Sequence, residues 1–419
     1  MIADATLERV LARRTVALLG DLIRGSLWGA VVLTWAMFAQ VYARMYRLTL
    51  ADPAHSDFTI FYFTARLLAD GLPMYGASPA RYGVHWAADH LGNLNPPHFQ
   101  LLVQPLAWLS YGRAYAAWVG VNAVALGLSV IVIVRALAIE LTWRRFAIGG
   151  AVIMSTAPFT TVAITSEWTF LLMLPATLAW AAARRGQWAR AGLWLGVCAS
   201  LKLFFLLFVP WLILRRRWTA LAGMGAAAAT AVSVGVIAYG PFTYGQWLQS
   251  LGQVGWWWLP MNASWHGLVS RIFQGGSSVQ PLIDLPPAVA PLGAAGAVVF
   301  SAVTISVARQ LSANPAHCDL AFLLLTSGAL IASPLGWVYY MPLLLGPVIA
   351  VGCTGMWRLL STRELAAIGA AGSGLYVSLE QASSGQPSAL LSITLASIYF
   401  WSAFAVWLGA VALSKRVAG

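Results

Sequence analysis

The sequence predicts an all-α, polytopic membrane protein of about twelve transmembrane helices. The first observation is composition: 60% of the 419 residues are hydrophobic, only 9% are charged, and the mean hydropathy is +0.74. The second is the recurrence of apolar segments close to the roughly 20 residues that a bilayer requires. The third is that the basic residues gather in alternate connecting segments. A soluble fold with a large core does not combine these features.

We expect the first crossing near the N-terminus, and because no small-residue cleavage site follows it, we expect it to be retained. The expected crossings are 26–43, 113–136, 146–164, 168–183, 190–201, 203–214, 218–239, 288–309, 318–332, 338–354, 364–380 and 388–412. The pair 190–201 and 203–214 is too short for two full crossings, so we interpret it as a hairpin dipping in from the cytoplasm, with Lys202 near its turn. Residues 1–419 are predicted to form one integral membrane domain.

The basic residues predict the orientation, because cytoplasmic loops retain positive charge. Arginines cluster at 9–24, 144–145, 184–190 and 215–217. A cytoplasmic N-terminus and C-terminus place these clusters inside. The net charge of +12 then follows from topology and not from a nucleic-acid partner, which would require a clustered basic face on a soluble surface.

Two outer loops, 44–112 and 240–287, are too long to be simple connectors, and we expect them to form the active-site cavity. Within the first loop, the apolar segment 96–110 is too short to cross and is predicted to be interfacial or re-entrant. Interfacial helices are expected in both loops.

One such helix is predicted after Asp57. Thr59, Tyr62, Arg66 and Asp70 form a polar stripe at helical spacing, apolar side chains form another, and Gly71 ends the pattern. The two stripes favour a helix lying in the membrane surface.

Asp57 has two interpretations that can coexist. Ser56 or Asp57 can cap the following helix by accepting a hydrogen bond from a first-turn N–H. Alternatively, the Asp57 carboxylate is a general base that removes a proton from an acceptor hydroxyl. Asp52, His55 and Asp57 could also be read as metal ligands, but their spacing fits no compact motif, and we predict no metal site.

Three further residues are candidates for binding a charged or sugar ligand. Glu167 is expected at an outer helix junction, where it binds a sugar hydroxyl or caps a helix. Lys202 lies among apolar residues, so it either snorkels to water or pairs with an anion such as a phosphate. Arg271 is the only basic residue of the second outer loop; its guanidinium matches phosphate geometry, or it anchors to lipid headgroups.

Five of the six histidines are also predicted at the outer side: His55, His85, His90, His98 and His266. Titratable groups concentrated at one membrane face indicate a candidate site. Trp256, Trp257 and Trp258 are expected to belong to an interfacial aromatic belt, although tryptophans also stack on sugars.

Taken in order, several motifs between about residues 50 and 350 resemble the family 87 glycosyltransferases, membrane enzymes of the GT-C fold. The motifs are FTIFYFTARLLADGLPMYG, PPHFQLLVQPLAWL, the segment from SEWTF to LRRRW, NASWHGLVSR and ASPLGWVYYMPLLL. The chain departs from the family pattern at Leu203, where relatives have proline. It also has Ser166 and Glu167 in place of a Gly-Gln-x-Asn-like element, and Tyr339 and Tyr340 where relatives often carry a histidine.

The resemblance implies an inverting transfer of a sugar from a polyprenyl-phosphate donor to a lipid or glycan hydroxyl on the extracytoplasmic, periplasmic face of a bacterial inner membrane. The sugar is a hexose or pentose, with mannose as the first expectation, and no cofactor is implied. Asp57 falls on the position of the catalytic base, and Lys202 and Arg271 are assigned to the donor phosphate. The residues assigned to the sugar or acceptor are Glu167, His98, Asn262, His266, Tyr339 and Tyr340.

The alternative is a membrane transporter or lipid flippase, which would place charged residues along a path through the helices and often show internal repeats. No repeat relates the two halves of the sequence, and Lys202 is the only clear ionisable residue deep in a predicted span. Protease and oxidoreductase motifs are absent from the sequence.

Overall fold

The computed structural model of the chain describes residues 2–53, 56–76, 82, 92–311, 314–383 and 388–418, with side chains from residue 25 onward. Within these ranges the secondary structure is helical, and β-type pairing is limited to two isolated bridges, Asn262 with Trp337 and Gly276 with Val279. The prediction of an all-α fold is therefore confirmed for the described residues.

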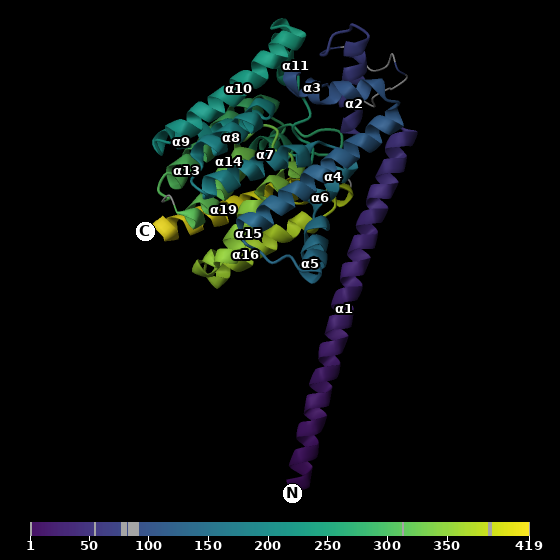
Figure 1. Cartoon of the computed structure of the whole chain (residues 1–419), viewed down its shortest axis with the longest axis vertical. Helices are drawn as coiled ribbons and strands as arrows, with labels where there is room; N and C mark the ends of the chain where they lie inside the picture. The colour runs from purple at the N-terminus through teal and green to yellow at the C-terminus, as the bar shows by residue number, and fades with distance from the viewer. Residues whose placement is uncertain are drawn as a thin grey trace.

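Figure 1 shows the order and arrangement of the helices. The first half contains α1 (Ile2–Ala51), α2 (Asp57–Ala69), η3 (Pro97–Phe99), α3 (Gln100–Val103), η4 (Gln104–Trp108), α4 (Tyr111–Ala136), α5 (Trp143–Met154), α6 (Ala157–Thr165), α7 (Thr169–Arg184), α8 (Trp188–Leu201), η5 (Leu203–Leu207) and α9 (Phe208–Leu214). The second half contains α10 (Trp218–Tyr239), α11 (Phe242–Gly252), α12 (Trp265–Phe273), η6 (Pro286–Ala288), α13 (Val289–Ala308), α14 (Pro315–Ala332), η7 (Val338–Leu344), α15 (Leu345–Thr354), η8 (Met356–Leu359), α16 (Thr362–Gly372), η9 (Ser373–Tyr376), α17 (Leu379–Ser383), α18 (Ala389–Ile393), η10 (Leu395–Ser397) and α19 (Ile398–Ala418).

Among the described residues, six helices are long and apolar enough to cross a membrane, or up to seven if the bent pair α5 and α6 is one span. This pair bends by 71°. Five predicted crossings fall on shorter helices and stay predictions: 168–183, 190–201, 203–214, 338–354 and 364–380. The extended backbone of Lys202 separates 190–201 from 203–214, and the segments 203–214, 338–354 and 364–380 are each divided into shorter helical elements.

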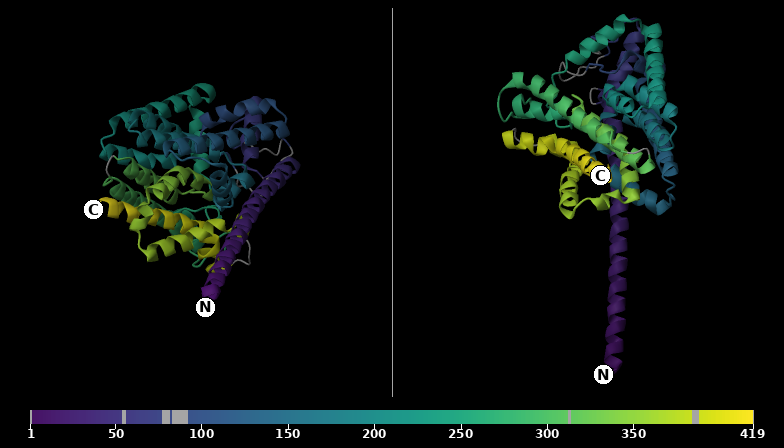
Figure 2. Two further views of the ribbon diagram at one scale, coloured as in Figure 1. Left: turned by 60° about the horizontal axis from the view of Figure 1, so that its bottom comes forward. Right: turned by 90° about the vertical axis from the view of Figure 1, so that its left-hand side faces the viewer.

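Helix α1 projects away from the rest of the chain (Figures 1 and 2). Aromatic contacts with α5 hold its second half: Trp28 stacks on Trp143 with ring centres 5.0 Å apart, and the Trp35 indole N–H donates to the Ala147 carbonyl at 3.0 Å. The part from Gly25 to Ala51 is long and apolar enough to cross a membrane and buries little of its surface in the protein. Its apolar face is therefore available to lipid.

Glycines allow α8 and α10 to approach one another closely. A Cβ atom on Gly192 would lie 2.0 Å from the Ala220 carbonyl oxygen, and one on Gly196 would lie 2.3 Å from the Met224 carbonyl oxygen. Small residues permit such backbone contact between membrane helices, where packing replaces the hydrophobic driving force. This helix pair carries Lys202 at the end of α8.

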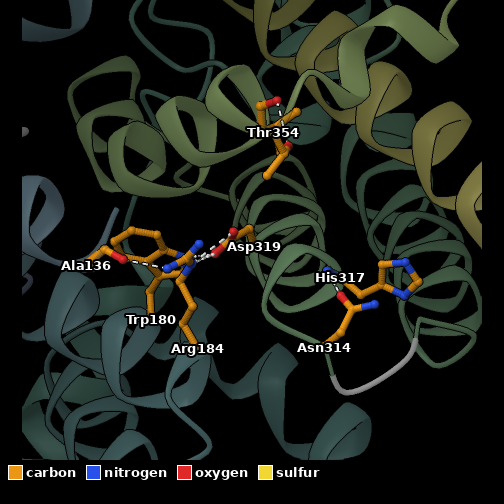
Figure 3. A network of polar contacts seen from close by, with 8 residues as sticks. Ala136, Trp180, Arg184, Asn314, His317, Asp319 and Thr354 are labelled. Atoms are coloured by element: carbon orange, nitrogen blue, oxygen red, sulfur yellow. Dashed lines mark hydrogen bonds and ion pairs between the residues drawn. The ribbon is translucent and has the colours of Figure 1, made fainter. Parts of the chain in front are cut away.

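A buried ion pair joins α7 to α14 (Figure 3). Arg184 Nε lies 3.0 Å from Asp319 Oδ1, and the Trp180 indole N–H donates to the same oxygen at 2.8 Å. Arg184 also donates to the carbonyl of Ala136 at the end of α4. This network lies at the C-terminal end of α7, while Glu167 precedes the other end, about 24 Å away at 1.5 Å per residue.

Helix α2 begins and ends as the sequence predicts, but it packs within the protein. Its predicted polar stripe bonds to the segment after it: Tyr62 donates to the Leu109 carbonyl at 2.8 Å, and Arg66 donates to the Ala107 carbonyl at 3.2 Å. Eight of its 13 residues are buried. Helix α2 therefore packs on the segment 96–110 through Tyr62 and Arg66, and its location in the membrane surface stays a prediction. That segment is three short helical pieces, η3, α3 and η4, as expected for a segment that does not cross.

Candidate active site

A cavity of about 440 Å³ lies where the start of α2, the α6–α7 link, the α8–η5 break and the segments before α12 and η7 meet. Its charged lining residues are Asp57, Glu167 and Lys202. Tyr339 and Tyr340 also line it, so the structure brings together five of the nine predicted site residues. The remainder of the lining is predominantly apolar and aromatic.

The N-cap of α2 is Ser56 and not Asp57. The Ser56 side chain accepts from the Phe58 N–H at 3.2 Å and is the cap of α2. Asp57 is the first residue of the helix, and its side chain borders the cavity. A carboxylate there is also favoured by the positive end of the helix dipole. Asp57 is therefore not required for capping.

A strained turn presents Glu167 to the same cavity. Ser166 has a left-handed backbone with φ of 56°, an uncommon conformation for a residue other than glycine. Two hydrogen bonds hold it: its hydroxyl lies 2.7 Å from the Tyr115 hydroxyl, and its carbonyl accepts from the Trp118 indole at 2.9 Å. Strain of this kind persists only where the surroundings fix it, and it clusters at functional sites.

The carboxyl groups of Asp57 and Glu167 both border the cavity, and each influences the pKa of the other. Burial raises the pKa of Asp57 to about 7 and the pKa of Glu167 to about 8. The positive charge of Lys202 opposes both shifts. Two adjacent carboxyl groups in a dry site do not both ionise readily, so the pair shares protons near neutral pH.

Lys202 stands at the break between α8 and η5, where the backbone is extended. Its ammonium donates to Asn95 Oδ1 at 3.0 Å and lies 4.8 Å from the centre of the Trp168 ring and 5.3 Å from that of Tyr340. The side chain thus lies in a polar and aromatic environment beside two carboxyl groups. A lysine among apolar residues is costly unless it has polar partners, and Asn95 supplies one here.

Aromatic rings form one wall of the cavity. Trp256 stacks on Trp337 with ring centres 5.4 Å apart, and Trp337 stacks on Tyr339 at 6.1 Å. Trp247 and Trp257 also line the cavity. The sequence assigned Trp256 and Trp257 to an interfacial belt and did not single out Asn95, Trp168 or Trp337. Trp168 and Trp337 lie in the motifs SEWTF and ASPLGWVYYMPLLL, whereas Asn95 lies in none of the motifs.

Arg271 and Asn262 lie outside the cavity lining and have other partners. Arg271 is completely buried; its guanidinium donates to Ser397 Oγ at 2.8 Å and to the carbonyls of Leu259 and Asn262 at 3.0 and 3.1 Å. The Asn262 amide donates to the carbonyls of Trp257 and Pro334, both at 3.0 Å. Both side chains therefore fix the loop that carries the aromatic wall instead of facing its cavity.

His98 and His266, the two histidines predicted at the outer side that the structure describes, are also absent from the cavity lining. His98 Nδ1 is 3.0 Å from the Tyr244 hydroxyl, and His266 packs edge to face on Trp257 at 4.7 Å. His55, His85 and His90 lie outside the described residues, so the Asp52, His55 and Asp57 triplet cannot be placed. The described part of the chain contains no group of three or more His, Cys, Asp or Glu side chains that could hold a metal.

The model of glycosyltransferase family 87 matches residues 93–334, which is more than half of the chain. The chain belongs to glycosyltransferase family 87. No curated protein and no solved structure matches it. Family membership and the apolar helices together identify a membrane glycosyltransferase, as the sequence motifs indicated.

The segment that matches the family, 93–334, contains Glu167 and Lys202 but does not include the other site residues that line the cavity. Asp57 precedes it, and Tyr339 and Tyr340 follow it. The glycosyltransferase therefore completes its cavity with side chains from both sides of the matched segment. A glycosyl transfer needs a group that removes a proton, groups that stabilise a leaving group, and walls that hold two substrates. The cavity offers a side chain for each of these tasks.

Proposed function

We propose that this glycosyltransferase moves a sugar from a polyprenyl-phosphate carrier to a hydroxyl of a lipid or glycan acceptor, with Asp57 as general base. The single observation that carries the proposal is the placement of the Asp57 carboxyl and the Lys202 ammonium on one cavity. One group accepts the proton of the attacking hydroxyl, and the other stabilises the departing phosphate.

In the proposed step the acceptor oxygen attacks the anomeric carbon of the sugar. The new carbon–oxygen bond forms as the bond from that carbon to the carrier phosphate breaks, and the electron pair leaves with the phosphate. The proton of the hydroxyl passes to Asp57. A single displacement inverts the anomeric carbon, and the carrier is released as polyprenyl phosphate with one additional negative charge. The enzyme needs no nucleophile of its own, because the donor is already activated.

The lining of the cavity supports a lipid-linked donor. Leu203, Phe204 and Leu251 give it an apolar side, and Lys202 provides a positive charge beside them. Fixed charges in a water-poor site stabilise a developing anion more strongly than they do in water. A phosphate head with a prenyl tail requires this combination of surfaces.

The aromatic wall supports a sugar as the transferred group. Trp256, Trp337 and Tyr339 form a stack of aromatic rings in this wall, while Glu167 and Tyr340 provide polar atoms for hydroxyl groups. The choice of one sugar depends on a few such hydrogen bonds. A hexose or pentose, with mannose first, remains the proposed substrate class.

We place the reaction on the periplasmic, extracytoplasmic side of a bacterial inner membrane, with both termini cytoplasmic. The support is the distribution of arginines: 144–145, 184–190 and 215–217 lie in links expected inside. Twelve crossings in a GT-C arrangement, with 44–112 and 240–287 as outer loops around the cavity, complete this proposal. No observation on the described residues favours the transporter or flippase alternative.

The test uses the full chain in lipid nanodiscs with radiolabelled polyprenyl-phosphate sugars and a panel of lipid and glycan acceptors. Asp57→Asn keeps the side-chain shape and removes the base, so transfer should fall by about 10²- to 10⁴-fold. Asp70→Asn is the matched control at the other end of α2, where Asp70 accepts from the Tyr82 hydroxyl at 2.7 Å. Equal turnover in Asp57→Asn and the parent would remove Asp57 from the mechanism.

A further inference from the structure

The segment just before η3 forms part of the wall of the catalytic cavity. Gly92, Leu94 and Asn95 line it. Asn95 is buried, and its Oδ1 accepts a hydrogen bond from the Lys202 ammonium at 3.0 Å. The Asn95 amide therefore belongs to the charged end of the site, although it is neither charged nor part of a sequence motif.

The backbone of Asn95 is held by its neighbours. Its N–H donates to Asn93 Oδ1 at 3.0 Å, and its carbonyl accepts from the Tyr75 hydroxyl at 2.5 Å. Pro96 follows it, and a proline restricts the residue before it to extended backbone. Asn95 is therefore a rigid point of the cavity wall, to which a flexible side chain can be fixed.

The direction of the Asn95 amide is fixed as well. A lysine ammonium only donates hydrogen bonds, so the amide atom that faces Lys202 is the oxygen. The other end of the amide, Nδ2, donates to Asn93 Oδ1 at 3.4 Å, and Asn93 is also buried. A turned amide would place an N–H group against the ammonium. Asn93 thus holds both the backbone and the amide of Asn95, with the oxygen toward Lys202.

Lys202 needs a fixed partner, because its ammonium stands on a flexible four-carbon stem. The ring centres of Trp168 and Tyr340 lie 4.8 and 5.3 Å away, but a ring face attracts a cation without a directed hydrogen bond. The ion pairs of the described residues do not include Lys202. Within this part of the chain, the hydrogen bond to Asn95 gives the ammonium its direction.

The acceptor is an amide oxygen without a net charge, which matters for an anionic ligand. A carboxylate in its place would pair with the ammonium, and a phosphate would then compete with that pair. A neutral oxygen orients the ammonium and leaves its charge for the ligand. An ammonium has three donors, so the bond to Asn95 leaves two of them for phosphate oxygens.

We propose that Asn95 is a positioning residue that holds the Lys202 ammonium in place for the phosphate of the donor. This inference rests on the proposed function, because it concerns the phosphate end of the same site. Since Asn95 acts on the donor through Lys202, its contribution to donor affinity disappears when the ammonium is absent. A residue that only supports the shape of the cavity would contribute equally with and without the ammonium.

The experiment is a double-mutant cycle on donor binding. The full chain in nanodiscs is titrated with a non-transferable polyprenyl-phosphate sugar analogue, using the parent, Asn95→Leu, Lys202→Met and the double variant. Asn95→Leu should weaken binding about tenfold in the parent, which corresponds to one charged hydrogen bond, and less than about twofold in Lys202→Met. Equal losses in the two backgrounds would overturn the proposal. If thermal unfolding shows that Asn95→Leu does not fold, Asn95→Ser takes its place in the cycle.

Asn95→Asp tests whether the neutrality of the acceptor matters. It keeps the size of the side chain and an oxygen for Lys202, but it adds a carboxylate that neutralises the ammonium. We expect the analogue to bind about tenfold more weakly at neutral pH than it binds the parent. Parental affinity in Asn95→Asp would contradict the proposed role of a neutral acceptor.

Asn122→Leu is the matched control. Asn122 is a buried asparagine of α4 outside the cavity lining, and its amide donates to the Trp118 carbonyl one turn earlier in the same helix. We expect parental donor affinity in this variant. A loss equal to that of Asn95→Leu would show that removing any buried amide weakens binding, which would contradict a specific role of Asn95.

The cycle also separates the failure of this inference from that of the proposed function. If Lys202→Met binds the analogue as the parent does, the phosphate role of Lys202 is wrong, and the role of Asn95 falls with it. If Lys202→Met weakens binding and Asn95→Leu does not, only the role of Asn95 is wrong.

Discussion

The side chains of Asp57, at the start of α2, and Glu167, in the link before α7, border one cavity and interact there. The Ser56 hydroxyl donates to the Thr165 carbonyl at 3.4 Å, so the same two segments are joined a second time beside the pair. Together these contacts align two carboxyl groups that the sequence places far apart. They make the pair, and not Asp57 alone, the group that titrates in the cavity.

The first prediction is the pH dependence of transfer. Since burial raises the pKa of Asp57 to about 7 and that of Glu167 to about 8, the base is protonated in acid and free in mild alkali. We expect kcat/KM to rise about tenfold per pH unit below this range and to reach a plateau above it. A pH profile of kcat/KM in nanodiscs checks this. An acid limb with its midpoint near 4, the ordinary range of an exposed carboxyl, would contradict it.

The second prediction concerns Glu167 as the partner of Asp57. In Glu167→Gln the side chain keeps a hydrogen-bond donor for the Asp57 carboxylate, whereas Glu167→Leu removes it. Because a hydrogen bond to the charged form lowers a carboxyl pKa, we expect the acid limb to move to higher pH in Glu167→Leu relative to Glu167→Gln. The two pH profiles are compared directly. If both variants keep the parental midpoint, Glu167 acts on the substrate and not through Asp57.

The third prediction concerns Lys202. Replacing it by methionine removes the ammonium that faces both carboxyl groups and, in our proposal, the donor phosphate. We expect donor affinity to weaken about 10- to 100-fold with little change in acceptor affinity, because a charged hydrogen bond contributes about 1.5–3 kcal/mol. The acid limb should also move to higher pH, since Lys202 lowers both pKa values. Isothermal titration with a non-transferable donor analogue, with Lys202→Arg as the charge-retaining control, separates these effects.

Unchanged donor affinity in Lys202→Met would reject the phosphate role. A midpoint that moves without any loss of donor affinity would leave Lys202 as a group that tunes the carboxyl pair only.

The fourth prediction concerns Arg271, for which a role at the donor phosphate was expected from its sequence position. Its guanidinium instead joins the loop before α12 to Ser397, so Arg271→Met should act through stability. We expect a loss of about 2–4 kcal/mol as carbonyl groups of the loop lose a charged donor. Thermal unfolding monitored by tryptophan fluorescence checks this. A variant with parental melting behaviour and weakened donor binding would restore the phosphate role.

The sequence alone determined the features that depend on near neighbours in the chain. The apolar segments predicted the helices because a bilayer requires long runs of hydrocarbon side chains. Ser56 and Gly71 predicted the two ends of α2, since capping and positive φ are local properties; Gly71 has φ of +73°. The order of motifs indicated the family, and Asp57, Glu167 and Lys202 stood out because charges are expensive in an apolar chain.

The tertiary structure alone decided which of these residues meet. Asp57 and Glu167 meet on one cavity, Lys202 contacts Asn95, and Trp256 stacks on Trp337. Each of these contacts joins segments that are distant in the chain, and no sequence period predicts them. The same reason separates Arg271 and Asn262 from the cavity. The Arg271 guanidinium has the chemistry to hold a phosphate, but it donates to carbonyls that folding brings around it, so its role depends on those partners and not on its chemistry alone.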